Sequence, residues 1–282
     1  WRASISVADA EGSQISQNQQ IERFLSLGYD VLCVNLVDRT NAAPIIDKAM
    51  EADIPIVFFN REPVPEDMEK WDRLCYVGSD ARQSAELEAQ IILDLWEREP
   101  QALDRNGDGV IQYIMMEGER RHQDTVIRTE GTIQALRDGG LELERLDSGI
   151  ANWDRTQAQA LMAGYLDQYG GQVELVICNN DDMALGVADA VEEANLDFHN
   201  IVGIDGTAAG ATAVSQGKLL GTVAMQPEIH GRTVFRLAME LASGKTVSEM
   251  EELGPDRSVR VPMEILSRSN RKEEMKYETL IH

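Results

Sequence analysis

Apolar residues along this chain alternate between short continuous runs and longer segments in which they recur every three or four positions. A short run predicts a strand buried on both faces, and the longer period predicts an amphipathic helix. The strand-like runs are residues 29–37, 55–60, 74–77, 112–116, 141–146, 173–178, 200–204 and 221–225. The helical segments are residues 42–52, 81–97, 124–138, 156–169, 181–194 and 227–243. Strand followed by helix, repeated this often, is typical of parallel sheets with helices on both faces, so the predicted fold class is α/β.

Composition and charge narrow the class of protein. Hydrophobic residues make up 43% of the 282 positions and charged residues 27%, as in ordinary globular chains. The formal net charge of −23 repels phosphate backbones and anionic lipid headgroups, which argues against a nucleic-acid partner. The longest apolar stretch, residues 54–59, is far shorter than the roughly 20 residues of a membrane-spanning helix. We therefore expect a folded chain that neither binds nucleic acid nor spans a membrane.

The cysteines and the chain ends carry weaker signals. Cys33, Cys75 and Cys178 lie in strand-like runs without a C-x-x-C spacing, which favours buried reduced thiols over a metal or redox site. The chain begins Trp1-Arg2-Ala3, with neither an initiator Met nor a signal segment, so we expect a start that is processed, cut or incomplete. Residues 267–282 have a weak helical pattern and little apolar content, which predicts poor packing.

A calcium loop is the most specific motif. Residues 104–112 read Asp-Arg-Asn-Gly-Asp-Gly-Val-Ile-Gln, in which alternate oxygen donors converge on one point and Gly109 makes the sharp turn. The donors are the side chains of Asp104, Asn106, Asp108 and Gln112 and the carbonyl of Val110. The twelfth position is Met115 where such a loop ordinarily has a bidentate Glu, so a carboxylate must come from elsewhere in the chain. The alternative is a polar surface turn that binds no ion.

This loop and several further motifs, in a fixed order, resemble the periplasmic galactose/glucose-binding proteins of the type I sugar-binding family. The matching segments are residues 34–38, 57–63, 76–80, 104–112, 122–124 with Arg128, 152–154, 178–181 and 203–205. The resemblance extends over roughly residues 5 to 266 and implies two doubly wound parallel-sheet lobes joined by three hinge crossings. It assigns residues 1–79 and 227–261 to the N-terminal lobe, and residues 80–226 and 262–282 to the C-terminal lobe with the calcium loop.

The resemblance also implies two sets of site residues. Glu174 would complete the shell of a structural calcium ion. The sugar-binding residues would be Asn60, His122, Asp124, Arg128, Trp153, Asn180 and Asp205. Their chemistry suits a hexose, because carboxylate, guanidinium and amide groups bind its hydroxyls while an indole covers an apolar face of the ring.

Each of these residues also has a plainer interpretation. Trp153 alone is typical of a core or edge aromatic, and His122 of a surface histidine. Asn180 after an apolar strand is a common helix N-cap, and Asp205 a common turn residue. The ends of parallel strands are nevertheless where ligands gather in open sheets, and Asn60, Asn180 and Asp205 all follow strand-like runs.

The chain departs from the family in two places. The family has a strand and a long helix before the strand that aligns with residues 5–7, so the resemblance implies an incomplete N-terminal lobe with an unpaired sheet edge. Met225 stands where the family has an Asn that contacts the sugar, and a one-residue shift would put Gln226 there instead. The identity of the hexose is left open by these differences.

The function that the resemblance implies is a periplasmic or extracellular solute-binding receptor. It would deliver a galactose- or glucose-like monosaccharide to the membrane permease of an ABC transporter. A chemoreceptor is an optional second partner, and the chain could carry a lipid anchor before processing. One alternative is the ligand domain of a sugar-responsive transcription regulator, although the chain has no basic helix-turn-helix segment. An enzyme using Asp124 and His122 is another, but no nucleophile elbow, open metal site or phosphate loop accompanies them. A truncated chain that holds calcium without binding sugar is the third.

Overall fold

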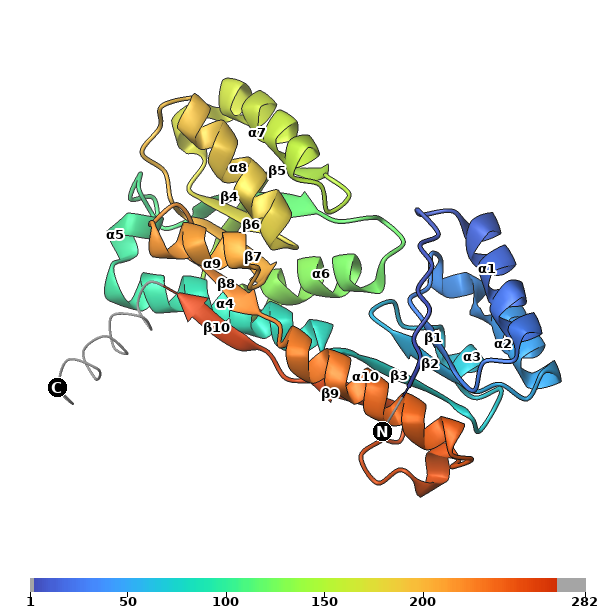
Figure 1. Ribbon diagram of the computed structural model, residues 1–282. Helices are drawn as coiled ribbons and strands as arrows, with labels where there is room; N and C mark the ends of the chain where they lie inside the picture. Colours follow the sequence, from blue (N-terminus) through green and yellow to red (C-terminus); the bar gives the residue numbers. More distant parts are fainter. Residues whose placement is uncertain (1–2, 268–282) are drawn as a thin grey trace, which may run out of the picture. The chain divides into compact units, whose positions relative to one another are not determined.

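The computed structural model describes residues 3–267, and within them the chain divides into two units (Figure 1). Within the described residues, the first unit comprises residues 3–79 and Gln226–Val261, and the second comprises Asp80–Met225 and residues 262–267. Both are built on largely parallel sheets, which confirms the α/β class. The segment expected to pack poorly lies, apart from Ser267, outside the described residues. In the described part of the chain, every helix is too short or too polar to cross a bilayer.

The first unit contains a four-stranded parallel sheet in the order β1-β2-β3-β9. Its strands are β1 (Leu32–Val34), β2 (Ile56–Phe59), β3 (Leu74–Ser79) and β9 (Ser258–Val261). Its helices are α1 (Gln14–Leu27), α2 (Ala42–Glu51), α3 (Pro65–Met68) and α10 (Pro227–Ala242), with short 3-10 turns at Arg39–Asn41 and Val247–Glu249. Successive residues of β2 serve opposite faces: Phe58 packs in the cluster of α1 and α2, and Val57 in that of α10. Burial on both faces explains why this strand reads as a continuous apolar run.

The strand that the family alignment predicts at residues 5–7 does not form. Residues 3–10 are extended without strand pairing, and the side chains of Ile5 and Val7 are 72% and 89% exposed. Among the described residues, β2 is the one strand neighbour of β1, so the edge strand offers its second side to no strand. The prediction fails because an extended segment needs a hydrogen-bonding neighbour to become a strand.

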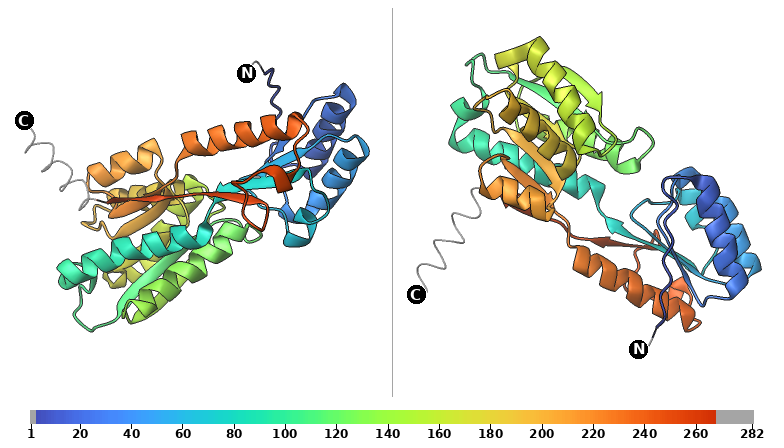
Figure 2. Two further views of the ribbon diagram at one scale, coloured as in Figure 1. Left: turned by 90° about the horizontal axis from the view of Figure 1, so that it is seen from below. Right: turned by 45° about the horizontal axis from the view of Figure 1, so that its top comes forward.

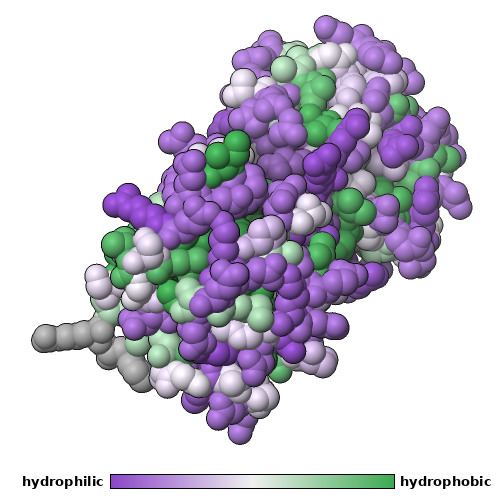
Figure 3. All heavy atoms as spheres, turned by 90° about the vertical axis from the view of Figure 1, so that its right-hand side faces the viewer, coloured by the Kyte–Doolittle hydropathy of each residue, from purple (hydrophilic) through white to green (hydrophobic). Residues whose placement is uncertain are grey.

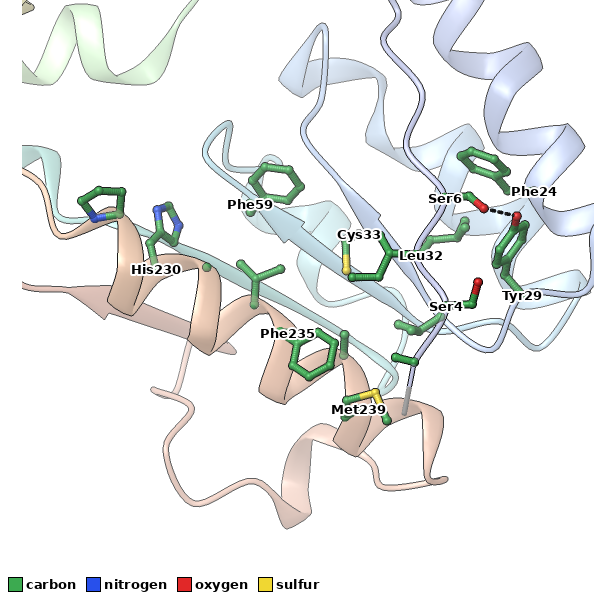
Figure 4. Close-up of a pocket in the computed structure, with 17 residues that line it drawn as sticks. Ser4, Ser6, Phe24, Tyr29, Leu32, Cys33, Phe59, His230, Phe235 and Met239 are labelled. Carbon is green, nitrogen blue, oxygen red and sulfur yellow. Dashed lines mark hydrogen bonds between the residues drawn. The ribbon is translucent and has the colours of Figure 1, made fainter. Parts of the chain in front are cut away.

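A groove of about 520 Å³ lies beside β1 within the first unit (Figure 4). One wall is the segment with Ser4 and Ser6, and another is the face of α10 that carries Phe235. Cys33 of β1 is exposed, so the prediction of three buried thiols is wrong for this residue, whereas Cys75 and Cys178 are buried. On the face drawn in Figure 3, apolar residues form patches between hydrophilic ones.

The second unit contains a six-stranded sheet in the order β10-β8-β7-β6-β4-β5, parallel except for β10. Its strands are β4 (Ile111–Glu117), β5 (Leu143–Ile150), β6 (Leu175–Cys178), β7 (Ile201–Asp205), β8 (Gly221–Ala224) and β10 (Glu264–Ser267). Its helices are α4 (Ala81–Arg98), α5 (Pro100–Leu103), α6 (Gln123–Asp138), α7 (Arg155–Tyr169), α8 (Asp181–Glu193) and α9 (Ala208–Ser215), with a 3-10 turn at Gly170–Gln172. Helices α4 and α6 cover one face, and α7 and α8 cover the other (Figure 2).

The order of these strands contains a switch point. From β4 the chain goes outward to β5 and then returns across β4 to β6, after which the strands continue in the other direction. The segments that follow β4 and β6 therefore lead to helices on opposite faces of the sheet. At such a switch point, parallel sheets bind ligands at the carboxyl ends of their strands.

Candidate functional site

The carboxyl ends of β4, β5, β6 and β7 bring together most of the predicted sugar-binding residues. Each follows or caps one of these strands or the helix after it. The members in the second unit are His122, Asp124, Arg128, Trp153, Asn180 and Asp205. Asn60, the seventh, belongs to the first unit, where it follows β2 with φ +61° and its carbonyl accepts a hydrogen bond from the Tyr76 hydroxyl at 2.7 Å.

Arg128 of α6 is the centre of this cluster. It is 4% exposed, and its Nη1 donates to the carbonyl of Asn179 at 2.8 Å. Nη2 lies 3.2 Å from a carboxylate oxygen of Asp124, one turn earlier on the helix, and Nη1 lies 3.8 Å from Asp205. The buried Nε makes no hydrogen bond with a described residue. The planar guanidinium thus holds together two carboxylates from different elements, one from α6 and one from the end of β7.

Asp205 ends β7 in an unusual state. Its backbone has φ +123°, and its side chain is 28% exposed. Burial raises the pKa of this carboxyl to about 7, with Arg128 acting in the opposite direction and Asp181 and Asp124 adding to the increase. Near neutral pH the group therefore divides between a carboxylate that accepts hydrogen bonds and an acid that also donates one.

Trp153 and His122 form the aromatic part of the site. Their rings meet edge to face at a centroid distance of 5.1 Å, and the indole ring lies 6.0 Å from the Arg128 guanidinium carbon. The backbone of Gly118, just after β4, approaches the indole so closely that a Cβ there would lie 2.2 Å from the ring. His122 Nδ1 accepts a hydrogen bond from the backbone N–H of Asp124 and so caps α6. The plainer interpretation of His122 as a surface histidine is wrong, since it is 6% exposed. Trp153 is half-buried and packs against the edge of the core cluster, which agrees with its plainer interpretation as a core or edge aromatic.

Asn180 is an N-cap, as its plainer interpretation predicts. Its Oδ1 accepts from the backbone N–H of Met183 at 3.0 Å and begins α8, while its Nδ2 donates to no described residue. The neighbouring Asn179, which the sequence analysis did not single out, organises the site. Its Oδ1 accepts from the Gly118 N–H, its Nδ2 donates to the Thr129 hydroxyl, and its carbonyl accepts from Arg128. A buried Asn that joins three elements has no signal in sequence beyond its place at a strand end.

Two fully buried acids, Asp181 and Glu88, lie near this cluster and were not predicted from the sequence. Asp181 accepts hydrogen bonds from the N–H and hydroxyl of Thr207 and from the Thr222 hydroxyl, which ties the loop after β7 to α8. Burial raises its pKa. Glu88 of α4 accepts from the Thr132 hydroxyl at 2.8 Å, and burial raises its pKa to about 8. Burial therefore favours the neutral, protonated form of both acids, and the Arg128 guanidinium opposes this effect at Glu88.

The predicted metal loop connects α5 with β4, and its polar side chains accept hydrogen bonds from its own backbone. Asp104 accepts from the N–H groups of Gly107 and Gly109, which have φ +76° and +83°. Asn106 accepts a hydrogen bond from the backbone N–H of Asp108, and Asp108 accepts one from the backbone N–H of Val110. The bond from Val110 lowers the pKa of Asp108.

Glu174 contacts the backbone of this loop. The residue is 1% exposed, and its carboxylate accepts from the N–H groups of Arg105, Asn106 and Gln112 at 2.6, 3.1 and 3.2 Å. Within residues 3–267, however, no three His, Cys, Asp or Glu side chains are gathered closely enough to form a metal cluster by themselves. The predicted donors are carboxylates, amides and a carbonyl, which are the hard oxygen ligands that calcium prefers.

The second unit holds a cluster of hydrogen-bonding groups beside an indole ring, and the described residues of this cluster include no activated nucleophile. Together with the two parallel-sheet units, these features are typical of a receptor for a small hydroxylated solute. The periplasmic binding protein domain matches residues 2–246, and the chain belongs to this family of non-enzymatic solute receptors.

Individual relatives agree with this assignment. The chain is 34% identical to the D-galactose/methyl-galactoside binding periplasmic protein MglB of Haemophilus influenzae over 256 residues, which are 90% of this chain and 77% of the relative. It is 31% identical to a putative rhizopine-binding protein of Rhizobium meliloti, over 94% of this chain and 80% of that one. Among solved structures, an ABC transporter solute binding protein of Bacillus halodurans with bound myo-inositol matches with a TM-score of 0.77 and 30% identity, over 95% of this chain and 84% of that one.

Proposed function

We propose that this periplasmic receptor binds a hexose of the galactose or glucose type and delivers it to an ABC transporter. The observation that carries the proposal is the cluster of Arg128, Asp124 and Asp205 beside the Trp153 ring. Relatives support the ligand class, since one is named for D-galactose and methyl-galactoside and another holds myo-inositol, both six-membered rings with several hydroxyl groups.

The site divides the recognition of a hexose between polar and apolar parts. The carboxyl groups of Asp124 and Asp205 would accept hydrogen bonds from sugar hydroxyls, and Arg128 fixes the positions of both. Trp153 offers a flat apolar surface to the C–H face of the ring. The arrangement would discriminate against solutes that lack a hydroxyl, because the remaining hydrogen-bonding capacity of the two carboxyl groups would then be left unused.

We propose further that the loop at residues 104–112 holds a structural calcium ion together with Glu174. The support is the order of the oxygen donors along the loop and the buried carboxylate of Glu174, which accepts hydrogen bonds from the loop backbone. Such an ion would stabilise the start of β4 without taking part in sugar binding. Delivery to a chemoreceptor as well as to the transporter stays a prediction of the family resemblance.

Titration with galactose and glucose tests the proposed ligand. Asp205→Ala should weaken binding more than about tenfold, since a charge-assisted hydrogen bond is worth roughly 1.5–3 kcal/mol. Asp197→Ala is the matched control, because this carboxylate lies in the same unit but is 98% exposed. Equal affinities in both variants, or no change in tryptophan fluorescence with either sugar, would contradict the proposal.

A further inference from the structure

A second hollow of about 470 Å³ lies in the second unit, and none of the predicted sugar-binding residues lines it. Its floor is β4, where Tyr113 and Met115 are 4% and 1% exposed. One side is a single face of α6, on which the lining residues recur at helical spacing: Thr129, Glu130, Ile133, Gln134 and Arg137. The other side is Arg145 of the edge strand β5, which lies opposite Tyr113 in the sheet register.

Two guanidinium groups converge on this hollow from different elements. Neither the Arg137 nor the Arg145 side chain forms an ion pair or hydrogen bond with any residue between positions 3 and 267. The chain has 49 acidic and 26 basic residues, and these two guanidinium groups face the hollow without a carboxylate partner from the described residues. Both act on the Tyr113 hydroxyl, because burial raises the pKa of this group while Arg145 and Arg137 lower it.

The Tyr113 hydroxyl is itself without a hydrogen-bond partner among the described residues. It is not among the fully enclosed unsatisfied polar atoms, so it reaches the solvent of the hollow. One phenolic donor and two guanidinium forks therefore surround the same space, and the side chains of Thr129 and Gln134 add neutral polar groups at its edge. The side chains of Met115 and Ile133 make part of the wall apolar.

We propose that this hollow, formed by Tyr113, Arg137 and Arg145, is a binding site for the oxyanion group of a small organic acid or phosphate ester, separate from the sugar site. Arginine pairs bind planar carboxylate and phosphate groups in bidentate fashion, and the tyrosine hydroxyl donates a third bond. The volume exceeds that of a bare oxyanion, which leaves room for a short carbon body against Met115 and Ile133. Glu130 also lines the hollow, and its negative charge would repel a bound anion, so its removal should increase the affinity for an anion.

The test uses the full chain and three probes: inorganic phosphate, succinate, and vesicles that contain phosphatidylglycerol. Binding is followed by calorimetry and by the NMR signals of the arginine Nε–H groups at low salt. The double variant Arg137→Gln/Arg145→Gln should weaken binding at least about tenfold, because it removes two charge-assisted contacts. The control Arg23→Gln/Arg232→Gln changes the net charge equally at two exposed arginines of the first unit and should bind as the native chain does. Glu130→Gln should tighten binding.

Each outcome bears on the proposal. Saturable binding of phosphate or succinate that the double variant loses supports a small-solute ligand, and binding confined to the vesicles with the same loss supports a lipid headgroup. Equal binding in the double variant and the control, or no saturation by any probe below about 10 mM, would overturn the proposal. Sugar titration of the same variants stays unchanged, so failure of the anion site and failure of the sugar site are distinguishable.

Discussion

The protonation of Asp205 should make hexose affinity depend on pH. Burial raises the pKa of this carboxyl to about 7, and hydroxyl groups of a sugar bond best to its ionised form. The ionised fraction is then about 0.9 at pH 8 and about 0.1 at pH 6, and the apparent Kd varies as the inverse of this fraction. Affinity should therefore fall about tenfold from pH 8 to pH 6.

The sign follows from the direction of the pKa shift. Lowering the pH protonates the group and removes an acceptor, so binding weakens with acid and releases part of a proton at pH 7. The same raised pKa means that the carboxyl contributes stability that is fully present below about pH 4 and is lost as the pH rises through about 7. Asp205→Asn should therefore gain melting temperature over the native chain at pH 8 but not at pH 4.

Calorimetry at pH 6, 7 and 8, in buffers of different ionisation enthalpy, measures both the affinity and the released proton. Asp205→Asn should bind more weakly at pH 8 and lose most of the pH dependence. A native Kd that is equal at pH 6 and pH 8 would refute the reasoning, as would a variant that keeps the native profile.

Three further predictions concern other parts of the molecule. A calcium chelator should lower the melting temperature of the native chain, because the folded state loses about 2.7 kcal/mol of stability if calcium is normally at a hundredfold excess over Kd. Glu174→Gln should abolish this response to chelator. A native chain whose melting temperature does not change with chelator would contradict the calcium site. Gly118→Ala should weaken sugar binding more than tenfold, because a Cβ 2.2 Å from the Trp153 ring must displace it by more than about 1 Å; Gly164→Ala, which meets nothing within 4 Å, is the control and should bind normally. Hydrogen exchange should be faster in the first unit, where β1 has one strand neighbour and residues 3–10 are unpaired, whereas equal protection in both units of a monomeric sample would contradict this.

The periodicity of the sequence predicts the central elements well for a physical reason. Strands β4 and β6 are buried on both faces, so nearly every residue in them is apolar and the run stands out. The peripheral elements β9, β10 and α9 were missed. Strands β9 and β10, with the sequences SVRV and EILS, are short and partly charged, and α9 is made of small residues that give little periodicity. The strand expected at residues 5–7 failed because local pattern cannot show whether a neighbouring strand is present.

The candidate sites show the same division. The loop at residues 104–112 is a local motif, and its donors can be read from consecutive positions. The position of Glu174 beneath it was available through the family resemblance alone, since 62 residues separate it from Gln112. Asn179, Asp181 and Glu88 support the sugar site through contacts between distant elements, and such buried hydrogen bonds leave no pattern in one sequence.

The most direct test of the central claim is calorimetric titration of the full chain with D-galactose, D-glucose and myo-inositol at pH 8 in the presence of calcium. The account predicts saturable binding of galactose or glucose with one site per chain, lost in Asp205→Ala and retained in Asp197→Ala. Binding of myo-inositol in preference to both hexoses would contradict the proposed ligand. Absence of binding by all three, in a sample whose hydrogen exchange shows both units folded, would contradict the assignment of the cluster around Arg128 as a sugar site.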